Sequence, residues 1–443
     1  MKPIRFAARI ATALAAAGCA LAVVGVLLPA AWAQDTGAPR VRPPEFESGH
    51  ELPLTTSPPP SAPLAETLDA AVLLTALAVA AWLVLRVRSR RAVAWLAAAC
   101  LAYFGFWREG CVCPVGATQN VALALFDPGY AVPLVVAAFF FLPLVFTLAF
   151  GRVFCAGVCP LGAIQDVFLL RPVRVPAWLD EGLRLLAYAY LGLAVLYAAT
   201  DSAFVICRYE PFVSFFRLSG GAKMLALGAC ILVLGMFVGR PYCRWLCPYG
   251  VLLGFAGFVS RWRVSITPDR CVQCRLCEDS CPYGAIVLPT PARTAENRVA
   301  ARRRLAGVLA ALPLLVLAAG WLGGRLGPTL ARAHPTLALA ERLRAEDRGE
   351  VRGTVDPTVA FRRTGKPAAA LYAEAAAVRE RFDRGGVWLG VWLGLAVGLR
   401  LVFLCRLPRR AGHEADRSRC LACARCFDYC PTEYERRKAA FAV

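Results

Sequence analysis

Residues 271–282 read CVQCRLCEDSCP, and residues 420–431 read CLACARCFDYCP. Both have the C-x2-C-x2-C-x3-C-P spacing that holds cubane iron-sulfur clusters, with three closely spaced thiolates at three corners. In proteins with two such runs, the fourth Cys of each run binds the other cluster. We therefore expect two [4Fe-4S] clusters, the first held by Cys271, Cys274, Cys277 and Cys430, and the second by Cys420, Cys423, Cys426 and Cys281.

Zinc is the alternative metal for these cysteines. A structural zinc site closes one tetrahedron with two separated pairs of ligands, and it has no use for a third Cys at the x2 spacing followed by Cys-Pro. The duplication of the whole pattern also argues against chance. The two runs therefore favour iron-sulfur clusters over zinc.

The composition indicates a membrane protein with metal or redox chemistry. Of 443 residues, 58% are hydrophobic and 18% are charged, a balance that disfavours a soluble domain. A chain this apolar does not need disulfides to complete its core, yet it contains 19 Cys and only 3 His. The formal net charge of +20 is compatible with nucleic acid, anionic lipid or cytoplasmic membrane loops.

Hydrophobic runs predict about seven membrane spans after residue 34, most of them near the ~20-residue length that crosses a bilayer. They lie at 68–85, 92–107, 130–150, 184–199, 222–239, 305–324 and 387–405. Arg-rich short loops follow the first, third, fifth and last of these runs, so they fall on one side, which the positive-inside rule makes cytoplasmic. Orientation explains most of the positive charge, and no nucleic-acid partner is needed.

Two further cysteine pairs stand in an internal repeat. Residues 151–162 read GRVFCAGVCPLG, and residues 239–250 read GRPYCRWLCPYG. If each motif is helical, Cys155 and Cys159 share one face, as do Cys243 and Cys247, and the two pairs could supply four thiolates to one site. A redox or metal role, as a cluster or as two dithiols, stands against a structural one in which the Cys are small buried hydrophobes.

A weaker group comprises Cys111 and Cys113 in the segment CVCPVGA and Cys207 in ICRYEPF, both expected on the outer side. Either Cys207 forms a disulfide with one of the pair, or the three have a redox or metal role. Four other cysteines stand singly in apolar runs and are interpreted as packing residues; they are Cys19, Cys100, Cys230 and Cys405.

The pattern gives the following organisation. We expect a signal peptide or first transmembrane helix (1–33), a periplasmic Pro-rich linker (34–66), a transmembrane core with the paired motifs (67–260), a first ferredoxin half (261–300), a transmembrane helix (305–324), a periplasmic segment (325–386), a transmembrane helix (387–405) and a second ferredoxin half (406–443). The fold class is thus an all-α polytopic membrane protein whose cytoplasmic two-cluster module is split by two spans.

Other cofactors lack support in the sequence. None of the three His lies in an expected span, so paired His ligation of an intramembrane haem is not available, and there is no Cys-x-x-Cys-His for covalent haem. We find no glycine-rich motif for nicotinamide or nucleotide phosphates. The expected spans also lack the buried acids of ion pathways, which disfavours a transporter.

At these motifs the chain resembles the membrane-bound polyferredoxins, which include NapH-type, CcoG-type and NosR/NirI-type proteins. The nearest resemblance is to the membrane half of NosR/NirI-type proteins, carried by REGCVCPVG at 108–116 and ICRYEPF at 206–212. That group places a flavin-binding domain before the spans, whereas residues 34–66 are too few and too rich in Pro to form one.

The resemblance implies an electron-transfer component of a bacterial inner membrane that links a cytoplasmic or quinone-pool donor to a membrane or periplasmic respiratory partner. Whether the chain is itself an enzyme stays open. The alternative is a redox-active maturation or regulatory factor, for example one that reduces a metal during assembly of a respiratory enzyme.

Overall fold

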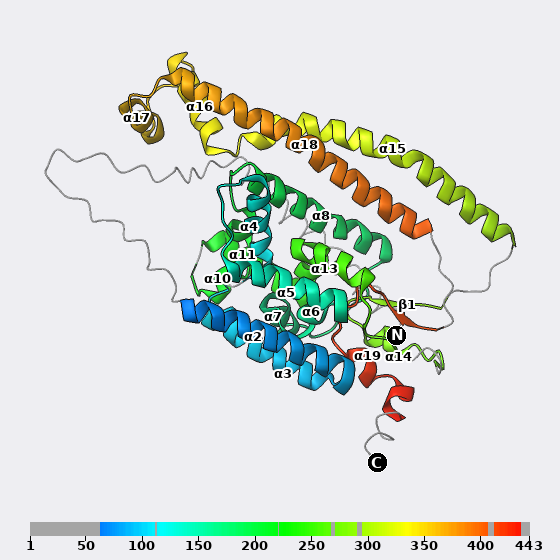
Figure 1. Ribbon diagram of the computed structural model, residues 1–443. Coiled ribbons are helices and arrows are strands. Elements are labelled where there is room, and N and C mark those ends of the chain that lie inside the picture. The colour runs from blue at the N-terminus through cyan, green and yellow to red at the C-terminus, as the bar shows by residue number, and fades with distance from the viewer. Residues whose placement is uncertain are drawn as a thin grey trace.

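The computed structural model describes residues 63–110, 113–219, 221–266, 271–289, 295–405 and 412–435. The expected signal segment (1–33), residues 34–62 of the linker and Cys111 lie outside the described residues. Within them the chain is mostly helical (Figure 1). Four helical stretches are long and apolar enough to cross a membrane: Ala65–Val87, Ala177–Ala199, Val299–Ala331 and Ala368–Cys405.

The helices and strands follow in chain order. They are α2 (Pro63–Trp82), the π-helix η1 (Leu83–Val87), α3 (Arg90–Cys100), the π-helix η2 (Leu101–Trp107), α4 (Pro114–Phe126), α5 (Leu134–Phe150), α6 (Val153–Gly157), α7 (Pro160–Val167), α8 (Ala177–Ala199), α9 (Val205–Tyr209), α10 (Val213–Phe216), α11 (Ala222–Gly235), α12 (Pro241–Trp245), α13 (Pro248–Val259), α14 (Leu276–Ser280), β1 (Ile286–Val287), α15 (Ala295–Ala331), α16 (Pro335–Asp347), α17 (Asp356–Arg363), α18 (Ala368–Cys405), β2 (Glu414–Ala415) and α19 (Arg425–Asp428).

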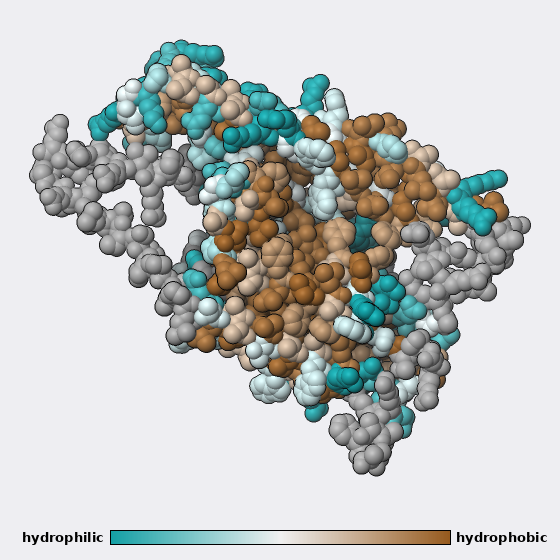
Figure 2. Space-filling view, in the orientation of Figure 1, coloured by the Kyte–Doolittle hydropathy of each residue, from teal (hydrophilic) through white to brown (hydrophobic). Residues whose placement is uncertain are grey.

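A helix occupies each of the expected apolar runs, but the lengths differ from expectation. The helices α5 and α11 are shorter than the run that a bilayer requires, whereas α15 continues past residue 324 to Ala331 and α18 begins at Ala368, well before residue 387. Apolar helices α4 and α13, which we did not predict as separate elements, pack with α5 and α8 in the core. In Figure 2 an apolar middle lies between hydrophilic groups at the upper left, over α16 and α17, and at the lower right.

The helices α15 and α18 form an antiparallel hairpin and lie side by side along the top of Figure 1. Small residues face each other along the contact: Gly323 lies against Gly386, and Gly390 lies against Ala319. Membrane helices approach closely through such small residues because apolar side chains gain little by leaving lipid. This hairpin returns the chain from the first ferredoxin half to the second.

A two-stranded antiparallel sheet joins the ferredoxin halves, although their cysteine runs are far apart in sequence. Ile286 pairs with Ala415 and Val287 with Glu414, and the backbone N–H of Asp416 donates to the carbonyl of Ala285 at 2.8 Å. The short helices α14 and α19 pack on each other beside this sheet. The two halves therefore form one module at the lower right of Figure 1.

Candidate metal centres

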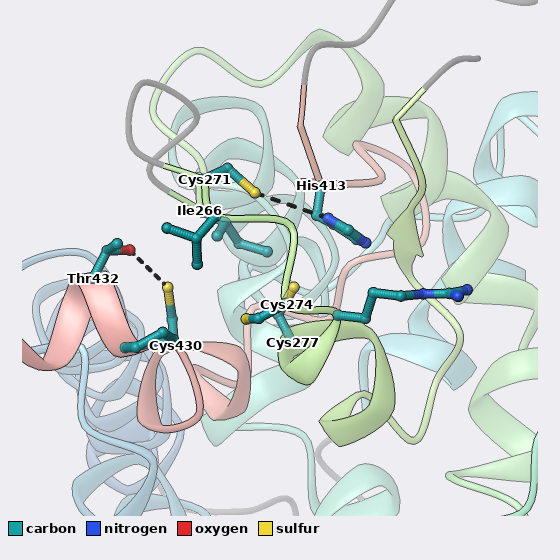
Figure 3. Close-up of a pocket in the computed structure, with 10 residues that line it drawn as sticks. Ile266, Cys271, Cys274, Cys277, His413, Cys430 and Thr432 are labelled. Carbon is teal, nitrogen blue, oxygen red and sulfur yellow. Dashed lines mark hydrogen bonds between the residues drawn. The ribbon is translucent and has the colours of Figure 1, made fainter.

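The first ligand set surrounds an open pocket. Figure 3 shows Cys271, Cys274 and Cys277 from the first run together with Cys430 from the second. Cys277 lies on α14 and is buried, whereas Cys274 is exposed. The structure thus brings the fourth Cys of the second run to the first three of the first run.

The remaining cysteines of the two runs are also close together. The thiol of Cys426 interacts electrostatically with those of Cys420, Cys423 and Cys281. Cys281 also acts on Cys420 and Cys423. Both sets therefore combine three thiols of one run with one thiol of the other.

The loops of the two runs have the same unusual backbone. Gln273 and Arg275 adopt positive φ angles of 53° and 65°, and Ala422 and Ala424, at the equivalent positions, adopt 55° and 62°. None of the four is glycine, and the left-handed conformation costs other residues roughly 1–2 kcal/mol each. Strain repeated at matching positions indicates that both loops are shaped to wrap a ligand.

The electrostatics of these thiols also fit a metal cluster. Burial raises the pKa of Cys277 to about 11 and that of Cys420 to about 12. Such thiols are protonated at neutral pH unless a cation holds them as thiolates, which iron does. No three ligand side chains in the described residues converge closely enough to hold one metal ion.

His413 is a site residue that the sequence did not reveal. It is buried, with Nδ1 at 3.9 Å from Cys271 Sγ and Nε2 at 3.9 Å from a carboxylate oxygen of Glu278 (Figure 3). It precedes β2, and the pairing of the two strands brings it to the first cysteine run. A hydrogen bond from the ring to the sulfur would raise the reduction potential of a cluster held there.

The paired motifs are buried in the helical core, but they are not continuous helices. Cys155 lies on α6, which ends at Gly157, and Cys159 is the extended residue before α7; Cys243 on α12 and Cys247 before α13 repeat this arrangement. The expected same-face helical geometry is wrong, because the following proline pushes the preceding residue out of the helical conformation. The four thiols nevertheless interact electrostatically with one another.

A buried ion pair connects the paired motifs to the first ferredoxin half. The guanidinium of Arg240 donates to both carboxylate oxygens of Asp166, at 2.9 and 2.8 Å, and also to the carbonyl oxygen of Cys155. Tyr283, two residues after Cys281, donates to Asp166 at 2.8 Å and lies against Arg240. The pair therefore holds the second ligand set against the paired motifs.

Arg152 makes a parallel connection to the second half. It donates to the carbonyl of Ser418 at 3.0 Å and to the sulfur of Cys155 at 3.7 Å. Ser418 lies two residues before Cys420. The equivalent arginines of the repeat thus attach the two ferredoxin halves to one cysteine site. The sequence assigned neither arginine this role, and Arg240 counted there as a loop charge.

Replacing Asp166 with asparagine should strongly destabilise the protein. Removing one partner of a buried pair leaves an uncompensated charge, which costs about 3–5 kcal/mol. Burial alone would raise the pKa of Asp166, but Arg240 and Arg90 outweigh it and hold the pKa well below the usual range. Because the folded pKa is depressed, this stabilisation is present above about pH 4 and is lost only as the pH falls further. Thermal unfolding in detergent across pH measures both effects.

Asp347→Asn is the matched control. Asp347 pairs with Arg362 at an exposed position, and such pairs contribute about 0–1 kcal/mol. Equal losses of thermal stability in the two variants would contradict the assignment of Asp166 to a stabilising buried ion pair. Loss of the Asp166 contribution to stability near neutral pH would also contradict it.

Of the two alternatives for the outer cysteines, a disulfide or a redox or metal role, the described residues show no disulfide between Cys113 and Cys207. Cys113 has no disulfide bond, is half-buried and precedes α4, while Cys207 is exposed on α9. The thiols of Cys113 and Cys207 interact electrostatically, and that of Cys113 also acts on Cys159. The weak group is therefore adjacent to the paired motifs.

These observations define a membrane-associated protein with ferredoxin-type 4Fe-4S binding domains. Two family models described as 4Fe-4S binding domains match it, one at residues 132–176 and 222–267 and the other at 264–287. The first covers both paired motifs and the second covers the first ferredoxin run. No solved structure matches the chain.

The relatives confirm the resemblance to NosR/NirI-type proteins. The chain is 31% identical over 152 residues to protein NirI of Paracoccus denitrificans, 30% over 154 residues to the regulatory protein NosR of Pseudomonas aeruginosa, and 29% over 151 residues to the methylamine utilization ferredoxin-type protein MauN of Paracoccus denitrificans. These matches cover 31, 31 and 33% of this chain and 22, 21 and 53% of the respective relatives. The matched part therefore spans about half or less of each relative.

Proposed function

We propose that this chain is an electron-transfer protein of a bacterial inner membrane, linking a cytoplasmic or quinone-pool donor to a membrane or periplasmic respiratory partner. The observation that carries the proposal is the joining of the two cysteine runs by β1 and β2. Cys271, Cys274, Cys277 and Cys430 would hold one [4Fe-4S] cluster, and Cys420, Cys423, Cys426 and Cys281 the other. Bound clusters would supply the one-electron chemistry, while the protein supplies their ligands and surroundings.

The two ligand sets have different surroundings: one is accessible from outside the protein, and the other lies against the helical core. The first set lies at an open pocket with exposed Val272 and Cys274 beside it, where a soluble partner can approach. The second set lies against the membrane core through Arg152 and Tyr283. Cys155, Cys159, Cys243 and Cys247 would form a further redox or thiolate-bound centre next to it.

The topology belongs to the same proposal. Seven spans with the Arg-rich loops inside would put both ferredoxin halves in the cytoplasm and residues 325–386 in the periplasm. Pairing of the halves requires them to share one side, and the α15–α18 hairpin between them supplies the even number of crossings.

A regulatory or maturation role is the second candidate. It is favoured by the similarity to NosR, whose name describes a regulatory protein. In that role the cysteines would sense redox state or reduce a metal during assembly, and continuous electron flow across the membrane would not be needed.

Electron flow across vesicles separates these proposals. Ferricyanide is trapped inside inverted vesicles as the electron acceptor. Reduced flavodoxin, a one-electron donor that cannot cross the membrane, is added to the outer solution. We expect ferricyanide reduction that right-side-out vesicles lack. Cys155→Ser should reduce the rate about as much as replacing all four paired-motif cysteines, tenfold or more, because residues that act as a unit show non-additive losses.

Each rate is normalised to the EPR signal of the ferredoxin clusters, with vesicles lacking the protein as the blank. A wild-type rate equal to the blank would favour the regulatory role. A quadruple variant that transfers electrons at the wild-type rate would remove the paired motifs from the function.

A further inference from the structure

Two buried glutamines, Gln165 and Gln119, each accept the backbone N–H of the residue directly before a cysteine. Gln165 stands six residues after Cys159, and its carbonyl oxygen accepts the backbone N–H of Tyr242, directly before Cys243, at 3.0 Å. Gln119 stands six residues after Cys113, and its carbonyl oxygen accepts the backbone N–H of Ile206 at 2.7 Å. Ile206 directly precedes Cys207, so the outer cysteines repeat the arrangement of Cys159 and Cys243.

The two outer sulfur atoms meet at one glycine. The thiol of Cys113 accepts the backbone N–H of Gly116 in the first turn of α4, as Cys159 does from Gly162 in α7. The sulfur of Cys207 lies 3.1 Å from the position that a Cβ of Gly116 would take. Any side chain at residue 116 would press on this sulfur, so the glycine permits the approach.

An acid lies beside this pair. Glu210 is buried and its carboxylate accepts hydrogen bonds from Tyr242 and from the backbone N–H of Phe212. Among the described residues, its Oε1 has no partner within hydrogen-bond distance. The titratable groups that interact with it are Cys113 directly before α4, Tyr190 on α8 and Tyr242 on α12. Burial raises the pKa of Glu210 to about 8, so near neutral pH it carries a proton that it can give to a thiolate.

We propose that Cys113 and Cys207 form a second redox-active thiol pair, adjacent to the paired motifs, that reduces a protein disulfide. Exposed Cys207 is the attacking residue, and half-buried Cys113 resolves the mixed disulfide. The proposal rests on the proposed function, which supplies the electrons.

The chemistry balances over one cycle. The thiolate of Cys207 attacks a partner disulfide, and one partner thiolate leaves. Attack by Cys113 breaks the mixed disulfide, releases the second partner thiolate and forms the Cys113–Cys207 bond. Two electrons from the one-electron donors of this chain and two protons then break that bond and restore both thiols. Glu210 supplies one of these protons and solvent supplies the other.

The test uses the full-length, cluster-loaded protein, with 5,5′-dithiobis(2-nitrobenzoate) as the probe disulfide and peptide mass spectrometry as the readout. We expect a Cys113–Cys207 crosslink in the wild type and a stable probe adduct on Cys207 in Cys113→Ser. Gln119→Leu should lower the crosslink severalfold, because it removes the acceptor for the backbone N–H of Ile206 directly before Cys207. A redox titration should follow a two-electron curve.

Independent probe adducts on both cysteines in the wild type, or a crosslink of Cys207 to Cys111 in place of Cys113, would overturn the thiol pair. The EPR signal of the ferredoxin clusters is recorded on every sample. If the EPR signal is present but no Cys113–Cys207 crosslink forms, this inference alone is rejected. If the EPR signal is absent, the proposed function is rejected.

Discussion

Replacing Gly390 with leucine is expected to reduce iron binding by about tenfold or more, although Gly390 is not near a cysteine ligand in the sequence. The reason is that overpacking costs about 1–3 kcal/mol, and this cost falls on the hairpin that joins the two ferredoxin halves. A Cβ at this position would overlap the carbonyl oxygen of Ala319 on α15. The two helices would have to separate, and the α15–α18 hairpin would no longer direct the chain after Cys405 toward β1. Iron and sulfide per chain, measured on purified protein, report the loss.

Gly307→Leu is the matched control on the same hairpin. Nothing lies within 4 Å of the position that its Cβ would take, so the same substitution meets no backbone there. We expect wild-type iron content in this variant. Equal iron content in both variants would show that close α15–α18 packing is not needed to assemble the module.

The cysteine spacing predicts two ferredoxin halves, and the structure brings the cysteines of the two runs together. Clusters impose a local pattern on the chain, and an even number of spans between the halves would return the chain to the same side of a membrane. The structure adds how the halves meet, through the pairing of Ile286 with Ala415. Two-residue strands are too short to leave a hydrophobic pattern that identifies them in a sequence.

The contacts of the paired motifs could not be predicted in the same way. Gln119 and Ile206 are 87 residues apart, and Arg240 and Asp166 are 74 apart. Each contact exists only after the helices have packed. An arginine that follows a span in the sequence fits a topology signal as well as it fits a buried ion pair. One signal was present: both buried glutamines stand six residues after a Cys-Pro cysteine.

The lengths of the helices also depended on tertiary structure. The helices α15 and α18 extend beyond their apolar runs, and the outer part of α18 packs through Leu371 and Phe382 against Leu337 and Leu343 of α16. Polar residues in these extensions lower their mean hydropathy, so a search for apolar runs does not include them. The breaks at Cys159 and Cys247 come instead from the proline that follows each of them.

The most direct test of the split module compares two double variants by iron analysis and low-temperature EPR. Cys271→Ala with Cys430→Ala removes ligands from one proposed cluster, so the protein should keep about four of its roughly eight iron atoms and one reduced-cluster signal. Cys271→Ala with Cys281→Ala removes a ligand from each cluster and should leave neither. If each run instead holds its own cluster, the first variant loses both clusters and the second keeps one, which would contradict the account.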